Sequence, residues 1–115
     1  MILRGLANIK KEAGDKCHGG TGKFSVRTLL EKEFESNLAY VRELVLHPQS
    51  SIGIHEHAGD EEIYYIVSGE GIMVVDDERE KVVPGDVILT KSGSRHGLIN
   101  ESDRDLKIFV VCSNL

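Results

Sequence analysis

Residues 53–69 read GIHEHAGDEEIYYIVSG and carry the clearest strand–turn–strand pattern of the chain. Two histidines, His55 and His57, are separated by one residue, so on a strand both side chains point to the same face. Residues 58–60 carry a turn signal, and the β-branched and aromatic residues that follow predict a second strand from Glu62 to Val67. The turn brings a carboxylate beside the two imidazoles.

The rest of the chain has the same pattern of short apolar or β-branched runs between turn residues. About ten strands at this spacing predict an all-β sandwich or barrel, and closure of the sheet edges favours a barrel or jelly roll. No segment has a helical period over ten or more residues. Residues 10–22 are Gly-rich and predict a loop, and residues 31–37 predict a loop or a single helical turn. The expected strands are Met1–Ile9 (at an edge), Phe24–Leu30, Leu38–Leu46, Ser51–His55, Glu62–Val67, Ile72–Val75, Arg79–Val83, Val87–Thr90, Gly97–Asn100 and Leu106–Cys112.

The composition excludes several classes of protein. The 115 residues fit one domain, and the net charge of −5, without a basic run, argues against a nucleic-acid partner. No apolar stretch is long enough for a membrane span, and the N-terminus lacks a signal-peptide pattern, so we expect a cytoplasmic protein. Cys17 and Cys112 form no CxxC pair and are expected to be free thiols.

A third histidine extends the possible site. His96 follows a Gly-bearing turn at the start of an expected strand. Three imidazoles and one carboxylate would form a mixed nitrogen and oxygen site, which suits Mn, Fe, Co, Ni, Cu or Zn and does not suit Mg or Ca. From the residues alone, however, an H-x-H pair is common by chance, and Glu61 and Glu62 could both belong to a solvated turn.

The spacing of the whole set resembles the two signature motifs of the cupin superfamily, in particular a small single-domain cupin with a conserved barrel. The first motif reads H-x-H-x4-E-x6-G and ends at Gly69, and the second contains Gly85, Gly93, His96 and Asn100 at the family spacing. Two positions depart from the pattern and predict locally different turns: Lys91 stands where the family usually has Pro, and Ser50 stands near the place of the leading Gly of the first motif.

The resemblance implies a double-stranded β-helix, or jelly-roll barrel, with residues 38–112 as the conserved barrel and residues 1–37 as N-terminal strands and the Gly-rich loop. It also implies that one divalent transition metal is bound near the barrel mouth, with two coordination positions left open. Glu62 is preferred to Glu61 because only Glu62 has the required spacing to Gly69. Dimers are common in the family, so we expect a homodimer, to which Met1–Ile9 could add a strand. The implied ligands are His55, His57, Glu62 and His96.

Three further residues are candidates for catalysis or ligand binding. If Glu62 points inward, Tyr64 does so too, and it either contacts the substrate or fills the barrel. Arg42 shares the parity of apolar neighbours, so a half-buried cation would need an anionic partner, either a carboxylate ligand or a structural Glu. Glu61 is a candidate for proton transfer, although it is expected to face away from the metal.

Other polar residues have simpler expected roles. Cys17 and His18 lie in the Gly-rich loop, which could be a flexible N-terminal loop or could cover the barrel mouth as a lid. His47 is expected to be exposed, Cys112 to be a core residue, and Asn100 to fix a turn or strand.

Three classes of function remain open. The first is an enzyme of dioxygenase, isomerase, decarboxylase or lyase type that binds a small organic acid on the metal. The second is a non-catalytic binding or sensor module that holds a small anion such as oxalate. The third is a purely structural metal site, which the open coordination positions disfavour.

Overall fold

The computed structural model describes all 115 residues and contains ten strands and two short 3-10 helices. This confirms the all-β prediction, since the chain has no α-helix. The structure contains no helix with the length and apolar character that a membrane crossing requires. The elements are η1 (Leu6–Asn8), β1 (Glu12–Asp15), η2 (Cys17–Gly19), β2 (Lys23–Leu30), β3 (Leu38–Leu46), β4 (Ser50–Glu56), β5 (Asp60–Ser68), β6 (Gly71–Val75), β7 (Glu78–Val82), β8 (Val87–Thr90), β9 (Arg95–Asn100) and β10 (Leu106–Asn114).

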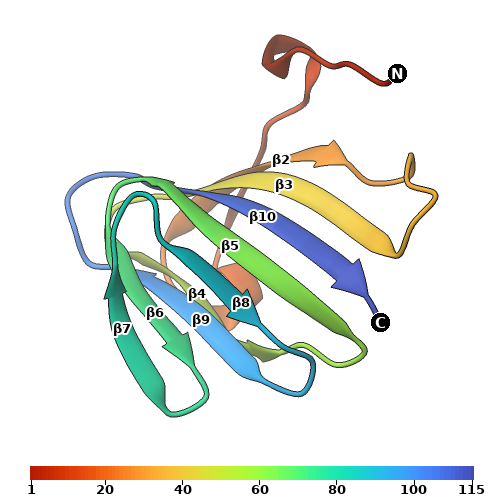
Figure 1. Ribbon diagram of the computed structural model, residues 1–115. Helices are drawn as coiled ribbons and strands as arrows, with labels where there is room; N and C mark the ends of the chain where they lie inside the picture. Colours follow the sequence, from red (N-terminus) through yellow and green to blue (C-terminus); the bar gives the residue numbers. More distant parts are fainter.

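The strands form two antiparallel sheets that enclose one core (Figure 1). The larger sheet has the order β1-β2-β3-β10-β5-β8, and the smaller has the order β4-β9-β6-β7. Fully buried side chains from the larger sheet, such as Ile66 and Ile108, pack against Ile52 and Leu98 from the smaller one. The chain is therefore a double-stranded β-helix, the jelly-roll barrel that was expected.

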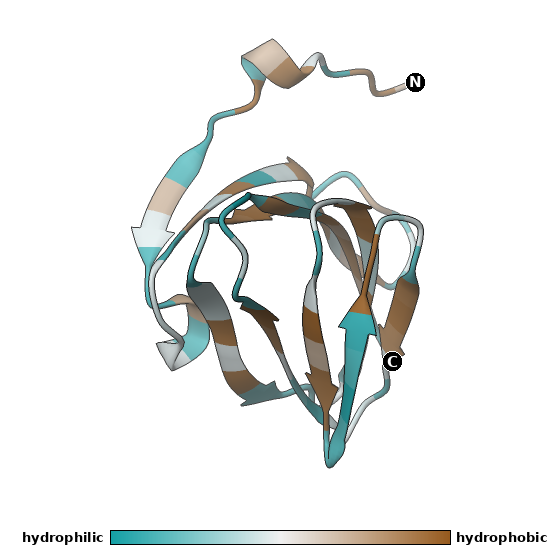
Figure 2. Cartoon of the chain, turned by 90° about the vertical axis from the view of Figure 1, so that its left-hand side faces the viewer, coloured by the Kyte–Doolittle hydropathy of each residue, from teal (hydrophilic) through white to brown (hydrophobic).

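The outer edge of the smaller sheet is protected by charge. Strand β7 reads EREKV, pairs with β6 only, and is exposed except at Val82. It appears as a mostly hydrophilic strand in Figure 2. Charged side chains on an edge strand discourage the addition of another strand, so this edge is closed to pairing.

A β-bulge in β4 determines which way its histidines face. Ile52 pairs with Leu98, but His55 pairs with His96, so β4 has one residue more than β9 between these two pairs. The extra residue shifts the alternation, and both the buried Ile52 and the later His55 point to the inside. Without the bulge, His55 would lie on the face opposite to Ile52.

The N-terminal segment differs from the prediction. Residues Met1–Ile9 form no strand and make an arm outside the barrel, which Arg4 ties to the end of β2 through the Leu29 carbonyl oxygen (Figures 1 and 2). The edge strand is instead Glu12–Asp15, inside the expected loop, and it pairs with β2. The reason is local: residues 16–22 reverse the chain, with a backbone hydrogen bond from Lys16 N to Gly22 O of 2.9 Å, so the segments on either side of this tight turn pair with each other.

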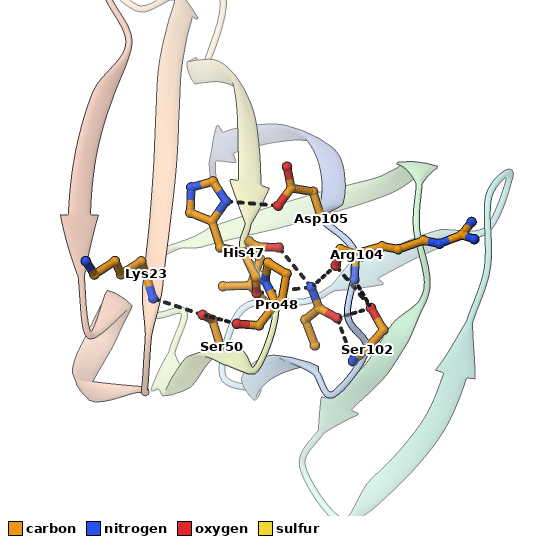
Figure 3. A network of polar contacts seen from close by, with 9 residues as sticks. Lys23, His47, Pro48, Ser50, Ser102, Arg104 and Asp105 are labelled. Carbon is orange, nitrogen blue, oxygen red and sulfur yellow. Dashed lines mark hydrogen bonds and ion pairs between the residues drawn. The ribbon is translucent and has the colours of Figure 1, made fainter.

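Asn100 joins two turns at the end of the barrel opposite the histidines. Its side-chain amide donates to the carbonyl oxygens of Leu46, His47 and Arg104 at 2.7–3.1 Å, while its Oδ1 accepts from Ser102. Figure 3 shows the labelled members of this network, His47, Ser102 and Arg104, around the same point. Asn100 is 1% exposed, so these bonds are shielded from water. The expected role of Asn100 in fixing turns is confirmed.

Candidate metal centre

Four side chains from three strands and one loop meet at one point inside the barrel. His55 comes from β4, His57 from the loop after it, Glu62 from β5 and His96 from β9. Their donor atoms all lie within 4.8 Å of one another. The His96 Nε2 atom is 2.9 Å from His57 Nε2 and 3.1 Å from His55 Nε2, and Glu62 Oε1 is 3.0 Å from His57 Nε2 and 3.2 Å from His96 Nε2.

The outer nitrogen of each imidazole has an acceptor. His55 Nδ1 lies 2.8 Å from the Gly53 carbonyl oxygen, and His57 Nδ1 lies 2.9 Å from Asp60 Oδ1. His96 Nδ1 lies 2.8 Å from the Thr90 hydroxyl, which is buried with it. A proton on each Nδ1 satisfies these contacts and leaves the three Nε2 lone pairs facing one another. Such a cluster of lone pairs and a carboxylate attracts a cation, so the donor set fits a divalent transition metal.

Glu62 is held as a carboxylate. The Tyr40 hydroxyl donates to its Oε2, while Oε1 faces the histidines. Burial alone would raise the pKa of Glu62, but its contacts with the neighbouring His96 and His57 imidazoles and the hydrogen bond from Tyr40 outweigh burial and lower the pKa below the ordinary value. Glu62 is therefore ionised at neutral pH and supplies the one negative charge among the four donors.

His55 is held neutral. Burial lowers its pKa to about 4, and the neighbouring imidazoles of His18, His96 and His57 add to this against the opposing Gly53 carbonyl. A neutral imidazole is the form that binds metals, so His55 is ready for coordination throughout the neutral pH range.

The other predicted site residues have distinct positions. Tyr64 belongs to the core cluster, and its ring centroid lies 4.9 Å from that of His96. Arg42 stacks over the Tyr40 ring at 3.7 Å and has no carboxylate partner in the chain. Glu61 is not part of the donor cluster and has the parity of the exposed Ile63. His47 lies outside the site and contacts Asp105.

The Gly-rich loop packs against the site. This position agrees with the alternative of a lid over the barrel mouth and not with that of a flexible N-terminal loop. The His18 ring stacks on the His55 ring with centroids 3.7 Å apart. Gly20 and Gly53 make this approach possible, because a Cβ atom on Gly53 would lie 2.2 Å from the His18 carbonyl oxygen and one on Gly20 would lie 2.1 Å from the Ser51 carbonyl oxygen.

A cavity of about 310 Å³ opens beside the cluster. Glu62 and Tyr64 line it from the larger sheet, together with Arg42, and the loop residues Cys17 and His18 cover it. The cavity reaches the donor cluster through Glu62, whereas a structural site would be sealed from solvent.

Three residues at the site were missed by sequence reasoning. Tyr40 binds Glu62, Asp60 binds His57, and Thr90 binds His96. Asp60 also accepts a hydrogen bond from the buried Cys112 thiol at 3.5 Å. Only Tyr40 had a usable signal, since it shares the inward parity of Arg42, whereas the other two depend on how separate strands meet.

Comparisons with known proteins agree with this geometry. The family model described as "Cupin domain" matches residues 42–112. The chain is 36% identical over 112 residues to an oxalate-binding protein from Thermotoga maritima, an alignment that covers 96% of this chain and 92% of the relative.

Solved structures show the same likeness. A structure from Thermotoga maritima described as a predicted oxalate decarboxylase has 34% identity and a TM-score of 0.93, with full coverage of both chains. A cupin 2 conserved barrel domain protein from Salinispora arenicola has 24% identity and a TM-score of 0.74, covers 99% of this chain and 89% of its own, and supports the fold alone.

Proposed function

The chain belongs to the cupin domain family, and we propose that it binds a small organic acid on one divalent transition-metal ion. The proposed ligands are His55, His57, Glu62 and His96. The observation that carries the proposal is the arrangement of the three imidazoles, whose Nδ1 atoms all have acceptors and whose Nε2 atoms converge on Glu62. Manganese, iron, nickel, cobalt, copper and zinc are all compatible with this donor set.

A carboxylate ligand is supported by charge as well as by the relatives. A bound divalent ion would act as a Lewis acid toward carboxylate oxygens. Arg42 adds a second cationic group on the wall of the same cavity, and no carboxylate of the chain neutralises it. A cation that is partly removed from water gains from an anionic partner, and the ligand is the candidate for that partner.

The test of the metal site compares two histidine variants. The untagged protein is purified, its metal content is measured, and its thermal stability is followed with added Mn²⁺, Ni²⁺, Co²⁺ or Zn²⁺. We expect a metal-dependent rise in melting temperature that His57→Ala abolishes, because a lost ligand removes much of the binding free energy. The control is His47→Ala, since His47 lies outside the cluster. A wild-type protein that neither contains nor is stabilised by any of these metals would refute the proposal.

A second candidate is an enzyme that acts on the same acid. The relative described as a predicted oxalate decarboxylase favours it, and the accessible cavity permits it. Oxalate decarboxylation converts one oxalate and one proton into formate and carbon dioxide. Formate that accumulates with the metal-loaded wild type but not with His57→Ala would establish turnover. Binding of oxalate without formate production would exclude this activity and support the binding function only.

We further propose that the protein is a homodimer through an apolar patch on the outer face of β5, β8 and β10. Tyr65 lies between Phe109 and Val87 in the sheet register and is 44% exposed. Contiguous exposed apolar surface of this kind marks interfaces in soluble proteins. Tyr65→Glu is expected to give a monomer in light scattering, while Val83→Glu outside the patch keeps the dimer. A monomeric wild type would exclude this assembly. The patch consists of Ile63, Tyr65, Val67, Val87, Leu89 and Phe109.

Two further proposals concern the domain organisation and the cellular location of the protein. Residues 1–115 act as one domain, since β2 pairs with β3 and η2 contacts β4 of the barrel, while β1 extends the larger sheet through β2. We place the protein in the cytoplasm, because Cys17 and Cys112 are both free thiols, as is usual in a reducing compartment. Limited proteolysis and cell fractionation test these two points.

A further inference from the structure

The cavity beside the proposed metal centre changes character along its length. In the sheet register, Glu62 is level with Tyr40, and the next inward-facing row contains Arg42 and Tyr64. The row after that contains Val26 and Leu44, and Phe24 lies beyond them. Consecutive rows on one face of a strand are about 7 Å apart. The cavity therefore runs from Glu62, past a cation, to an end lined by the apolar side chains of Phe24, Val26 and Leu44, and the exposed Asp15 and Lys16 also line it.

The cation in the middle of the cavity is held in place. The Arg42 guanidinium lies over the Tyr40 ring, 3.7 Å from its centroid, and Tyr40 is itself tied to Glu62. A stacked guanidinium presents its N–H groups in a fixed plane, which suits a carboxylate. A ligand carboxylate placed between Arg42 and a metal ion held by the donor cluster would be attracted by both cations.

The size of the cavity exceeds what the smallest acids need. A volume of 310 Å³ equals the space of about ten water molecules, at roughly 30 Å³ each. Oxalate has only six non-hydrogen atoms, both of its ends are charged, and it has no apolar part to place against Val26, Leu44 and Phe24. Water left against these side chains would keep their burial incomplete.

We propose that the ligand of this centre is a 2-oxo or 2-hydroxy monocarboxylic acid with a branched aliphatic or aromatic side chain. The adjacent oxygens of its head would bind a metal ion held by the four donors, the carboxylate would meet Arg42, and the side chain would fill the end formed by Phe24, Val26 and Leu44. This inference rests on the proposed function, because it specifies the acid that the metal centre binds.

The test uses acids that differ in one feature each. The full-length protein is loaded with Mn²⁺ and titrated with pyruvate, 4-methyl-2-oxopentanoate, 4-methylpentanoate and oxalate in a calorimeter. We expect 4-methyl-2-oxopentanoate to bind roughly tenfold or more tightly than pyruvate, since it has the same head and three more carbons to bury. The control acid 4-methylpentanoate, which lacks the 2-oxo group, is expected to bind at least tenfold more weakly than its 2-oxo counterpart.

A pair of variants locates the binding of the side chain. Val26→Phe fills the apolar end and is expected to remove the preference for 4-methyl-2-oxopentanoate over pyruvate. Val83→Phe makes the same change at an exposed position outside the cavity and keeps the preference. Circular dichroism checks that both variants fold, and the wild-type comparison of the two acids stands without them.

The possible outcomes distinguish a failure of this inference from a failure of the proposed function. Equal affinity for pyruvate and 4-methyl-2-oxopentanoate, with Mn²⁺ bound and oxalate binding intact, would overturn this inference and leave the proposed function standing. Failure of the protein to bind Mn²⁺ or any other divalent transition metal would instead overturn the proposed function.

Discussion

Asp60 offers a sharp test of how the histidine cluster is built. Its Oδ1 accepts from His57 Nδ1 at 2.9 Å, and His57 is only 7% exposed, so water cannot readily replace this contact. Asp60→Asn keeps the shape but removes the charge. If the amide group of the new side chain faces the ring, His57 must carry its proton on Nε2, where it blocks the lone pair that faces the cluster.

The expected loss follows from the role of such contacts. Removing the partner of a metal-binding histidine typically costs 10- to 100-fold in metal affinity. Asparagine can still turn its carbonyl oxygen toward His57, which retains a neutral acceptor, so we expect the lower part of this range. A tenfold loss corresponds to about 1.4 kcal/mol of binding free energy. Asp60→Ala, which offers no acceptor, is expected to lose more than Asp60→Asn.

The assay is competition for Zn²⁺ or Ni²⁺ against a chelating dye at constant pH. Asp77→Asn is the matched control, because Asp77 is in an exposed turn and the substitution removes the same charge. Melting of the metal-free variants shows whether they fold. If Asp60→Asn and Asp77→Asn bind metal within twofold of each other, Asp60 does not orient His57 and the reasoning from the Nδ1 contacts is wrong.

Three further predictions concern the same region. Tyr40→Phe removes the hydroxyl that donates to Glu62, so the pKa of Glu62 rises and the pH at which half the metal is lost should move upward; an unchanged pH curve would contradict this. The pKa of His55 is about 4 in the folded chain and 6.5 ordinarily, so the unfolded state binds more protons between these values. Stability of the metal-free protein should therefore fall as the pH drops from 6.5 to 4, and His55→Gln should flatten the urea-denaturation profile over that window. Gly53→Ala should lower the free energy of unfolding by about 2 kcal/mol because its Cβ would overlap backbone atoms, whereas Gly5→Ala in the arm should change it by less than about 0.5 kcal/mol in the same urea titration.

Much of the barrel could be predicted because its strands are short and bounded by turn residues. The run from Leu38 to Leu46 forms a strand with the expected bounds, as does the run from Val87 to Thr90. The N-terminal arm could not be assigned in the same way. Its apolar residues resemble those of an edge strand, yet the partner edge is occupied by Glu12–Asp15, whose polar composition gives no strand signal. The pairing of β1 with β2 depends on the chain reversal at residues 16–22. The sequence pattern predicts a loop at these residues but does not predict the pairing of the segments on either side.

In the candidate site, too, some residues can be predicted from the sequence and others cannot. The four candidate metal ligands can be predicted from the spacing of the two motifs, because a His or Glu stands at each motif position where a ligand is expected. The partners Asp60 and Thr90 do not follow, because an ordinary turn residue and an ordinary strand residue become functional only through the positions of His57 and His96. The position of His18 over the site does not follow from the sequence either, because it depends on the stacking of His18 on His55.

The bulge in β4 affects both the orientation of the histidines and the position of the Gly-rich loop. Simple alternation from the buried Ile52 would send His55 and His57 outward, so the H-x-H spacing alone does not build an inward site. The extra residue falls at Gly53 and Ile54, and Gly53 is also the position where the Gly-rich loop contacts the strand. A glycine within a strand often marks either a bulge or a close backbone approach, and here it serves both. The same residue therefore turns the two histidines into the barrel and admits the loop that covers them, which couples the orientation of the donors to the closure of the cavity.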